Sequence, residues 1–224
     1  DHDIILRAVD RMMGEDRHAA RKVKLPIAHI PKVLYHWRCY EGSTSENPES
    51  KRYAYEAGKR AVEDFLKARK YQADVVHTCH LGFFRVNYKP DLLSNRPDVA
   101  VVGGKLIGRH NRVVGGIYDE NREPLYLGLH KEYSGYMHRA SCQQEAYAVD
   151  VRCMICSGEA QAVWEELTGL PYVVQPHTGY FLYQDVLKKD ADYEELSFKF
   201  CEELRRRGKR IVWDPEMVQR VDGR

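Results

Sequence analysis

The sequence DYEELSFKFCEELRRRGKRIVWDP, at Asp192–Pro215, predicts a helix followed directly by a buried strand. The side chains expected on the buried face recur at helical spacing: Leu196, Phe200, Cys201 and Leu204. Gly208 tolerates the left-handed conformation that ends a helix, and Ile211–Trp213 then supplies a short apolar strand. A helix that leads straight into a strand is a building unit of α/β proteins.

A similar plan opens the chain. An acidic start is followed by a helix expected over residues 3–13, which Asp3 can cap. The extended apolar stretch Ile27–Trp37 comes next, and Pro31 within it predicts an edge strand or two short strands. Two copies of one plan, an acidic start, a helix and a strand, suggest two related modules.

The residues between the copies continue the alternation of helices and strands, which predicts the α/β class. The elements expected there are a helix at Asn47–Lys70, two strands around Gly82 within Val75–Tyr88, a strand at Val99–Val102 closed by Gly103 and Gly104, a hairpin of Val113–Tyr118 with Leu125–Leu129, and a helix at Gly158–Leu167. Turn signals near residue 90 predict a boundary there, between domains 1–90 and 91–224.

The composition is that of an ordinary globular protein. The chain has 224 residues, a net charge of +2, 43% hydrophobic residues and 30% charged residues. The basic cluster Arg205–Arg210 follows a predicted helix, where cations suit the helix dipole, so we expect no nucleic-acid partner. No apolar run approaches the ~18 residues of a membrane span, so we expect no transmembrane segment.

Of the six cysteines, only Cys153 and Cys156 have the spacing of a ligand pair. Ala148–Cys156 predicts one buried strand, on which side chains three positions apart point to opposite faces. We therefore favour buried free thiols, which is typical of cytosolic proteins. The alternative, a zinc site, needs a tight turn here and one further ligand from His130, His138 or Cys142.

Several motifs together resemble family 2 glycosyltransferases, in particular the tandem bacterial enzymes that build surface polysaccharides. In the first half these are Asp1–Arg7, His29–Arg38, Gly42–Ser45 and Gly82–Tyr88. In the second half, Arg96–Leu106 is similar to the strand before the acceptor region, Gly135–Arg139 looks like the middle of the module, and Arg205–Pro215 looks like its closing helix and strand.

The resemblance implies a GT-A fold, of which residues 1–90 and 91–224 would be the C-terminal parts of two modules. It also implies a nucleotide-sugar donor, a glycan acceptor and a divalent metal (Mg²⁺ or Mn²⁺) that offsets the charge on the leaving diphosphate. A carboxylate in such enzymes acts as general base on the acceptor hydroxyl.

Two aspartates match the position of that base. Asp1 lies ahead of the first helix, although a residue at the terminus of a sequence is also simply a chain end. Asp192 lies ahead of the last helix, where its spacing to Glu195 equally predicts a helix cap.

The resemblance also implies residues that bind metal and substrate. His36, at the end of the first apolar stretch, matches a position that reaches the metal, although a half-buried place in an aromatic cluster is the alternative. Arg38 is expected to meet phosphate, unless it is a solvated charge. Tyr136 and Arg139 are expected to contact substrate in the second module.

These observations predict a glycosyltransferase-like protein that transfers a sugar from a nucleotide-sugar donor to a glycan acceptor. No Asp-x-Asp motif ends an apolar strand, so donor binding is expected to be impaired. One alternative is a non-catalytic interaction or scaffold module, which self-associates or pairs with a complete transferase. Another is an unrelated zinc-binding α/β protein. The expected location is the cytoplasm, including the inner face of the membrane.

Overall fold

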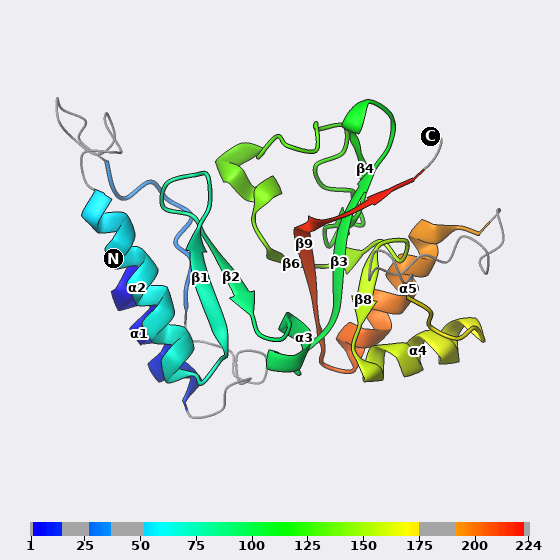
Figure 1. Ribbon diagram of the computed structural model, residues 1–224, viewed down its shortest axis with the longest axis horizontal. Helices are drawn as coiled ribbons and strands as arrows, with labels where there is room; N and C mark the ends of the chain where they lie inside the picture. Colours follow the sequence, from blue (N-terminus) through cyan, green and yellow to red (C-terminus); the bar gives the residue numbers. More distant parts are fainter. Residues whose placement is uncertain (1, 15–26, 37–51, 175–190, 222–224) are drawn as a thin grey trace. The chain divides into compact units, whose positions relative to one another are not determined.

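The computed structural model describes residues 2–14, 27–36, 52–174 and 191–221 (Figure 1). The chain divides into two compact units, Asp1–Asn95 (unit 1) and Arg96–Arg224 (unit 2). Helices and strands are mixed along the chain, as the α/β class requires. Among the helices described, none has the length and apolar character needed to cross a membrane.

Unit 1 pairs two helices with a β-hairpin. Its elements are α1 (His2–Met13), α2 (Arg52–Ala68), β1 (Ala73–His77), β2 (Phe84–Tyr88) and the short α3 (Leu92–Asn95). The strands β1 and β2 are antiparallel, and Val75 lies opposite Val86. Gly82 lies between them with a φ of 82°, a conformation that glycine adopts readily. The first helix and the two strands around Gly82 are therefore confirmed.

The apolar stretch that precedes α2 is not a strand where the structure describes it. Residues 27–36 form an irregular segment, so the predicted strand is wrong there, and Trp37 lies outside the described residues. Pro31 has no N–H to donate to a neighbouring strand, and the segment pairs with no described strand. Its apolar side chains are exposed: Ile27, Ile30, Val33, Leu34 and Tyr35.

Unit 2 is built on two long parallel strands that lie side by side in Figure 1, β3 (Val99–Ile107) and β9 (Arg210–Arg220). Antiparallel strands flank them: β4 (Val113–Gly115) and β8 (Met154–Cys156) pair with β3, and β6 (Gln144–Ala146) pairs with β9. A separate ladder joins β5 (Ile117–Tyr118) to β7 (Ala148–Val149). The helices of this unit are α4 (Gly158–Thr168) and α5 (Tyr193–Arg206).

Gly103 and Gly104 lie inside β3 rather than closing it, which corrects the prediction that the strand ends there. A Cβ on Gly103 would lie 2.3 Å from the Cβ of Val149, and one on Gly104 would lie 2.4 Å from the carbonyl oxygen of Met217. The Val149 side chain at Gly103 and the backbone of Met217 at Gly104 therefore approach β3 so closely that only glycine fits at both positions.

Three further strand predictions are wrong, two of them in their limits and one altogether. The strand β9 continues through Pro215, with a register shift opposite Gly104 that takes up the irregularity. No strand forms at 125–129, because Tyr126 has a φ of 64° and Gly128 a φ of 78°, outside the range of a β-strand. The stretch 148–156 is two strands, β7 and β8, separated by a turn at 150–153.

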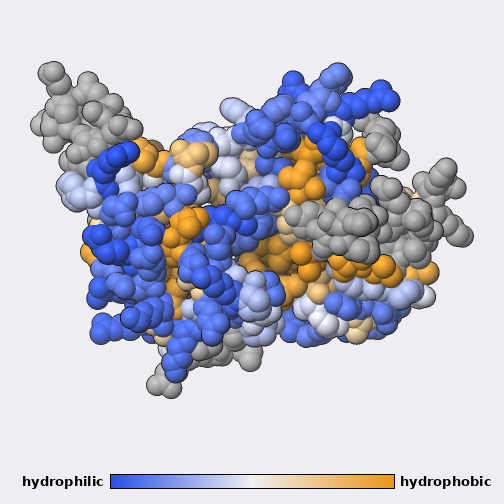
Figure 2. All heavy atoms as spheres, in the orientation of Figure 1, coloured by the Kyte–Doolittle hydropathy of each residue, from blue (hydrophilic) through white to orange (hydrophobic). Residues whose placement is uncertain are grey.

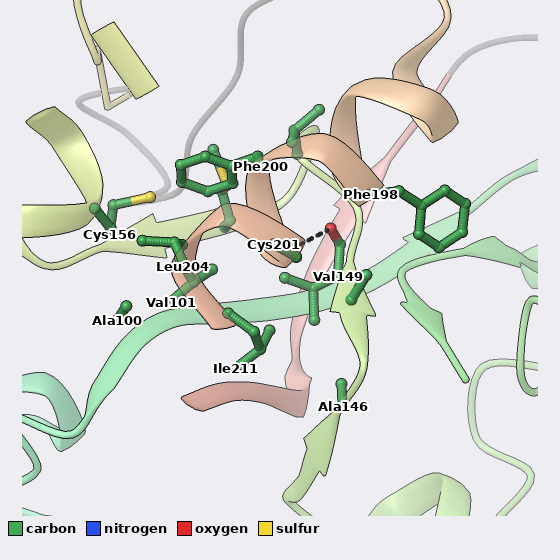
Figure 3. Close-up of a cluster of buried hydrophobic side chains, with 14 of the residues drawn as sticks. Ala100, Val101, Ala146, Val149, Cys156, Phe198, Phe200, Cys201, Leu204 and Ile211 are labelled. Atoms are coloured by element: carbon green, nitrogen blue, oxygen red, sulfur yellow. Dashed lines mark hydrogen bonds between the residues drawn. The ribbon is translucent and has the colours of Figure 1, made fainter. Parts of the chain in front are cut away.

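The core of unit 2 lies under α5 (Figure 3). The Cys201 thiol donates to the carbonyl oxygen of Val149 at 3.7 Å, and Phe200 packs edge-to-face on Trp164 with ring centroids 5.6 Å apart. Leu204 is also buried, whereas Leu196 is half-buried at the margin of the core. The predicted helix and its buried face are thus largely confirmed.

Candidate functional site

The residues predicted for the first module are not brought together in the described structure. Asp1 and Arg38 lie outside the described residues, so their roles stay predictions. His36 is exposed, which does not fit the alternative of a half-buried place in an aromatic cluster, and its role as a metal ligand stays a prediction. Across the described segments, no group of three His, Cys, Asp or Glu side chains is arranged to hold a metal ion. The divalent metal also stays a prediction.

Asp192 is the N-cap of α5. Its carboxylate oxygen Oδ1 accepts a hydrogen bond from the backbone N–H of Glu195 at 3.0 Å. The Glu195 carboxylate points to cations instead, with Arg122 at 3.3 Å and Lys199 at 3.7 Å. Asp192 therefore satisfies a free N–H at the start of the helix, which is the structural alternative to its predicted role as a base.

A substitution pair tests this assignment. Asp192→Ala is expected to lower the free energy of unfolding by about 1 kcal/mol, because the N–H of Glu195 loses its acceptor. Asp192→Asn keeps an acceptor oxygen and should leave stability nearly unchanged. Urea unfolding of the full chain measures both variants, and an equal loss in the two would contradict the capping role.

The turn after β7 holds a buried ion pair that sequence reasoning missed. Asp150 is fully buried and accepts hydrogen bonds from the Arg152 guanidinium at 2.7 and 2.9 Å and from the Tyr118 hydroxyl at 3.1 Å. The guanidinium also lies 4.9 Å from the Tyr193 ring. Burial, followed by the Asp150 charge, raises the pKa of Tyr118. The buried Asp150 carboxylate and the Tyr118 hydroxyl are satisfied internally, which favours a structural role.

The buried cysteines are free thiols with a low nucleophilic reactivity. Cys153 and Cys156 are buried, as predicted, and so is Cys201. Burial raises the pKa of the Cys153 and Cys201 thiols to about 12 and that of Cys156 well above its usual value. These thiols stay protonated at neutral pH, whereas the thiolate is the reactive nucleophile.

A groove of about 350 Å³ lies between α1 and α2 in unit 1. Carboxylates line it, but Arg7 lies 2.8 Å from Asp3, and Arg69 lies 3.3 Å from Asp10. Most of this acidic charge is therefore already balanced within the helix pair.

Unit 2 has a surface segment that carries exposed aromatic rings. Tyr136 is 84% exposed and Tyr133 is 59% exposed, and we call these two residues the aromatic platform. Arg139 is also exposed and lies with Tyr136 on the 3₁₀ segment η4 (Tyr136–Ser141). Exposed large aromatic side chains that are near one another in the chain are candidates for a binding surface.

The backbone under the aromatic platform is held by hydrogen bonds. The N–H of Ala140 donates to Ser134 O at 2.8 Å, and the Ser141 hydroxyl donates to His138 O at 2.8 Å. The Gln144 amide donates to Arg139 O at 2.7 Å, which ties the segment to β6. Met137 and His138 have positive φ angles, a conformation that non-glycine residues adopt where their surroundings hold them.

Tyr136 and Arg139, which the resemblance predicted, lie three residues apart on η4 and are both exposed, and their role in substrate binding stays a prediction. Tyr133 was missed, because its exposure cannot be seen in a local pattern.

Comparisons with known proteins add little to this geometry. No family model matches the chain, and no solved structure matches it. A stretch of 66 residues is 39% identical to an uncharacterized protein, y4gI, of Sinorhizobium fredii (strain NBRC 101917 / NGR234). That match covers 30% of this chain and 6% of the length of that protein.

Proposed function

We propose that this chain is a glycosyltransferase-like protein of the family 2 type, in which unit 2 binds the glycan acceptor on the aromatic platform. The observation that carries the proposal is the exposure of Tyr133 and Tyr136 on a segment whose backbone is held by hydrogen bonds. The sequence supports it, because Gly135–Arg139 belongs to the part that resembles the middle of the family's module.

Exposed tyrosines suit a sugar ligand for electrostatic reasons. The C–H bonds on one face of a pyranose ring carry partial positive charge, and the face of an aromatic ring carries partial negative charge. A sugar ring therefore packs flat on a tyrosine. Tyr133 and Tyr136 offer two such faces, and the nearby Arg139 offers guanidinium donors for sugar oxygens. The whole arrangement can recognise a chain of sugars without enclosing it.

Sugar transfer needs more than an acceptor surface. In the family that the sequence resembles, it also requires a nucleotide-sugar donor, a general base and a divalent metal. The described residues do not assemble a metal site, and Asp1, the base proposed for the first module, lies outside them. The proposal therefore assigns acceptor binding to described residues and leaves the donor, base and metal to experiment.

Affinity electrophoresis tests acceptor binding. The full chain is run in native gels that contain one of several neutral and acidic bacterial polysaccharides, and at least one is expected to retard it. Tyr133→Ala and Tyr136→Ala should each weaken binding about fivefold, because a ring contact is worth about 1 kcal/mol.

Tyr53→Ala is the matched control, because Tyr53 is 69% exposed on α2 in unit 1. It should bind as the parent does. Retardation that survives loss of both platform tyrosines, or that is absent with every polysaccharide, would contradict the proposal.

A thermal-shift titration with nucleotide sugars and Mn²⁺ tests the donor side separately. Stabilisation by one nucleotide sugar supports transfer by this chain, since a ligand that binds the native state raises its stability. Indifference to every donor, combined with glycan binding, favours a non-catalytic glycan-binding module.

A further inference from the structure

The arginines of unit 2 fall into two groups. Most lie within 4.0 Å of a carboxylate oxygen. For example, Arg96 lies 2.7 Å from Asp98, and Arg210 lies 3.0 Å from Glu145. Four have no such partner in the part of the chain that the structure describes: Arg109, Arg112, Arg139 and Arg220. All four are exposed.

These four arginines, which we call the cationic rim, lie on three segments of unit 2: the β3–β4 turn, the end of β9 and η4. Arg109 and Arg112 flank the turn from β3 to β4, and Arg220 ends β9 and donates to the side chain of Asn111 in that turn. Figure 2 shows hydrophilic residues over this turn. Arg139 lies on η4.

The cationic rim borders the aromatic platform. Arg112 forms a β-bridge with His130, and the N–H of Tyr133 donates to His130 O at 2.9 Å. The Arg112 guanidinium donates to Gly128 O at 2.9 Å, and the N–H of Lys131 donates to Asn111 O at 2.8 Å. The turn that carries two of the arginines is therefore hydrogen-bonded to the segment that carries the tyrosines.

The local excess of positive charge stands out in a chain whose net charge is only +2. Elsewhere in unit 2, arginine charge is balanced by carboxylates, whereas here it faces solvent. A surface of one charge sign attracts ligands of the opposite sign and speeds their association. Guanidinium groups bind carboxylate and phosphate oxygens through paired N–H donors.

We propose that the glycan bound at the aromatic platform is an anionic polysaccharide, whose carboxylate or phosphate groups meet the cationic rim. This inference rests on the proposed function, because the platform is what selects a sugar chain over other polyanions. The rim draws on three separate elements, β9, η4 and the β3–β4 turn, which fits a polymer with repeated acidic groups better than a single small anion.

Binding of alginate, a polyuronate, and of dextran, a neutral glucan, to the full chain tests the inference by calorimetry. Alginate is expected to bind about tenfold more tightly than dextran, and to weaken as NaCl rises to about 0.15 M, where charges are screened beyond about 8 Å. Dextran binding should be insensitive to salt.

The variant Arg109→Gln removes a rim charge whose side chain makes no hydrogen bond that would be lost within the described residues. It should weaken alginate binding about threefold and leave dextran binding unchanged. Arg206→Gln is the control, because Arg206 is exposed but pairs with Glu203. It should bind both glycans as the parent does.

The outcomes separate this inference from the proposed function. Equal affinity for alginate and dextran overturns the anionic inference and leaves the proposed function standing. If neither alginate nor dextran binds, the anionic inference and the proposed function both lose their support. Binding of double-stranded DNA or of anionic phospholipid vesicles as tightly as alginate also overturns the inference, because charge alone would then explain the affinity.

Discussion

Asp150→Ala is expected to destabilise unit 2 by about 3 kcal/mol, at the lower end of the cost of breaking a buried ion pair, because it leaves a half-buried guanidinium without its counter-ion. Arg152 would lose both side-chain hydrogen bonds to the carboxylate, and the buried Tyr118 hydroxyl would lose its acceptor. The N–H of Arg152 also donates to this carboxylate at 3.0 Å, so the turn between β7 and β8 would lose a backbone anchor.

Denaturant unfolding followed by tryptophan fluorescence measures this loss, since Trp164 and Trp213 are fully buried in unit 2. Glu120→Ala is the matched control. Glu120 is exposed and has no hydrogen bond or ion pair within the described residues, so its removal should change stability by less than about 0.5 kcal/mol. Equal stability of the Asp150 and Glu120 variants would contradict the assigned ion pair.

Gly104→Ala is expected to cost about 3 kcal/mol, at the upper end of the usual penalty for overpacking. The new methyl group would lie 2.4 Å from the carbonyl oxygen of Met217 and 2.6 Å from the Cys153 sulfur. The first of these is backbone of β9, the partner of β3, so the clash cannot be relieved by rotating a side chain. The two central strands would have to separate.

Gly158→Ala is the control for this substitution. A Cβ at Gly158 meets no atom within 4 Å, and the residue begins α4, where alanine is a better helix former than glycine. This variant should be as stable as the parent or slightly more stable. Thermal unfolding of the two variants compares them directly, and similar midpoints would show that β9 does not approach β3 as described.

Elements with local signals at both ends were predictable from the sequence. The helix α5 has Asp192 as its N-cap and Gly208 shortly after its end, and α4 ends at Gly169, whose φ is 68°. Caps and left-handed glycines act within a few residues, so the sequence alone carries the information that defines them.

Elements that depend on distant residues were not predictable in this way. The glycines of β3 suggested a strand end, but their role is to admit Val149 and Met217, which lie far along the chain. The turn between β7 and β8 contains no glycine or proline and is held by the Asp150 side chain instead. Side-chain hydrogen bonds of this kind leave little trace in hydrophobic periodicity.

Some residues of the candidate site were predictable from the sequence, and others required the structure. Tyr136 and Arg139 were found through resemblance, and the sequence placed them in one short segment. Tyr133 and the cationic rim required the structure, because the rim forms only when the β3–β4 turn meets the end of β9. The cap at Asp192, by contrast, was predictable from the sequence, because the spacing of Asp192 to Glu195 is that of a helix cap.

Mapping backbone amide shifts by NMR, on isotope-labelled full chain titrated with an alginate oligosaccharide, tests acceptor binding at the aromatic platform most directly. We expect the largest amide shifts in residues 129–141 and at Arg112. The ring signals of Tyr133 and Tyr136, recorded in the same titration, should move in parallel. Largest shifts in the groove between α1 and α2, or no shifts at saturating oligosaccharide, would contradict acceptor binding at the aromatic platform.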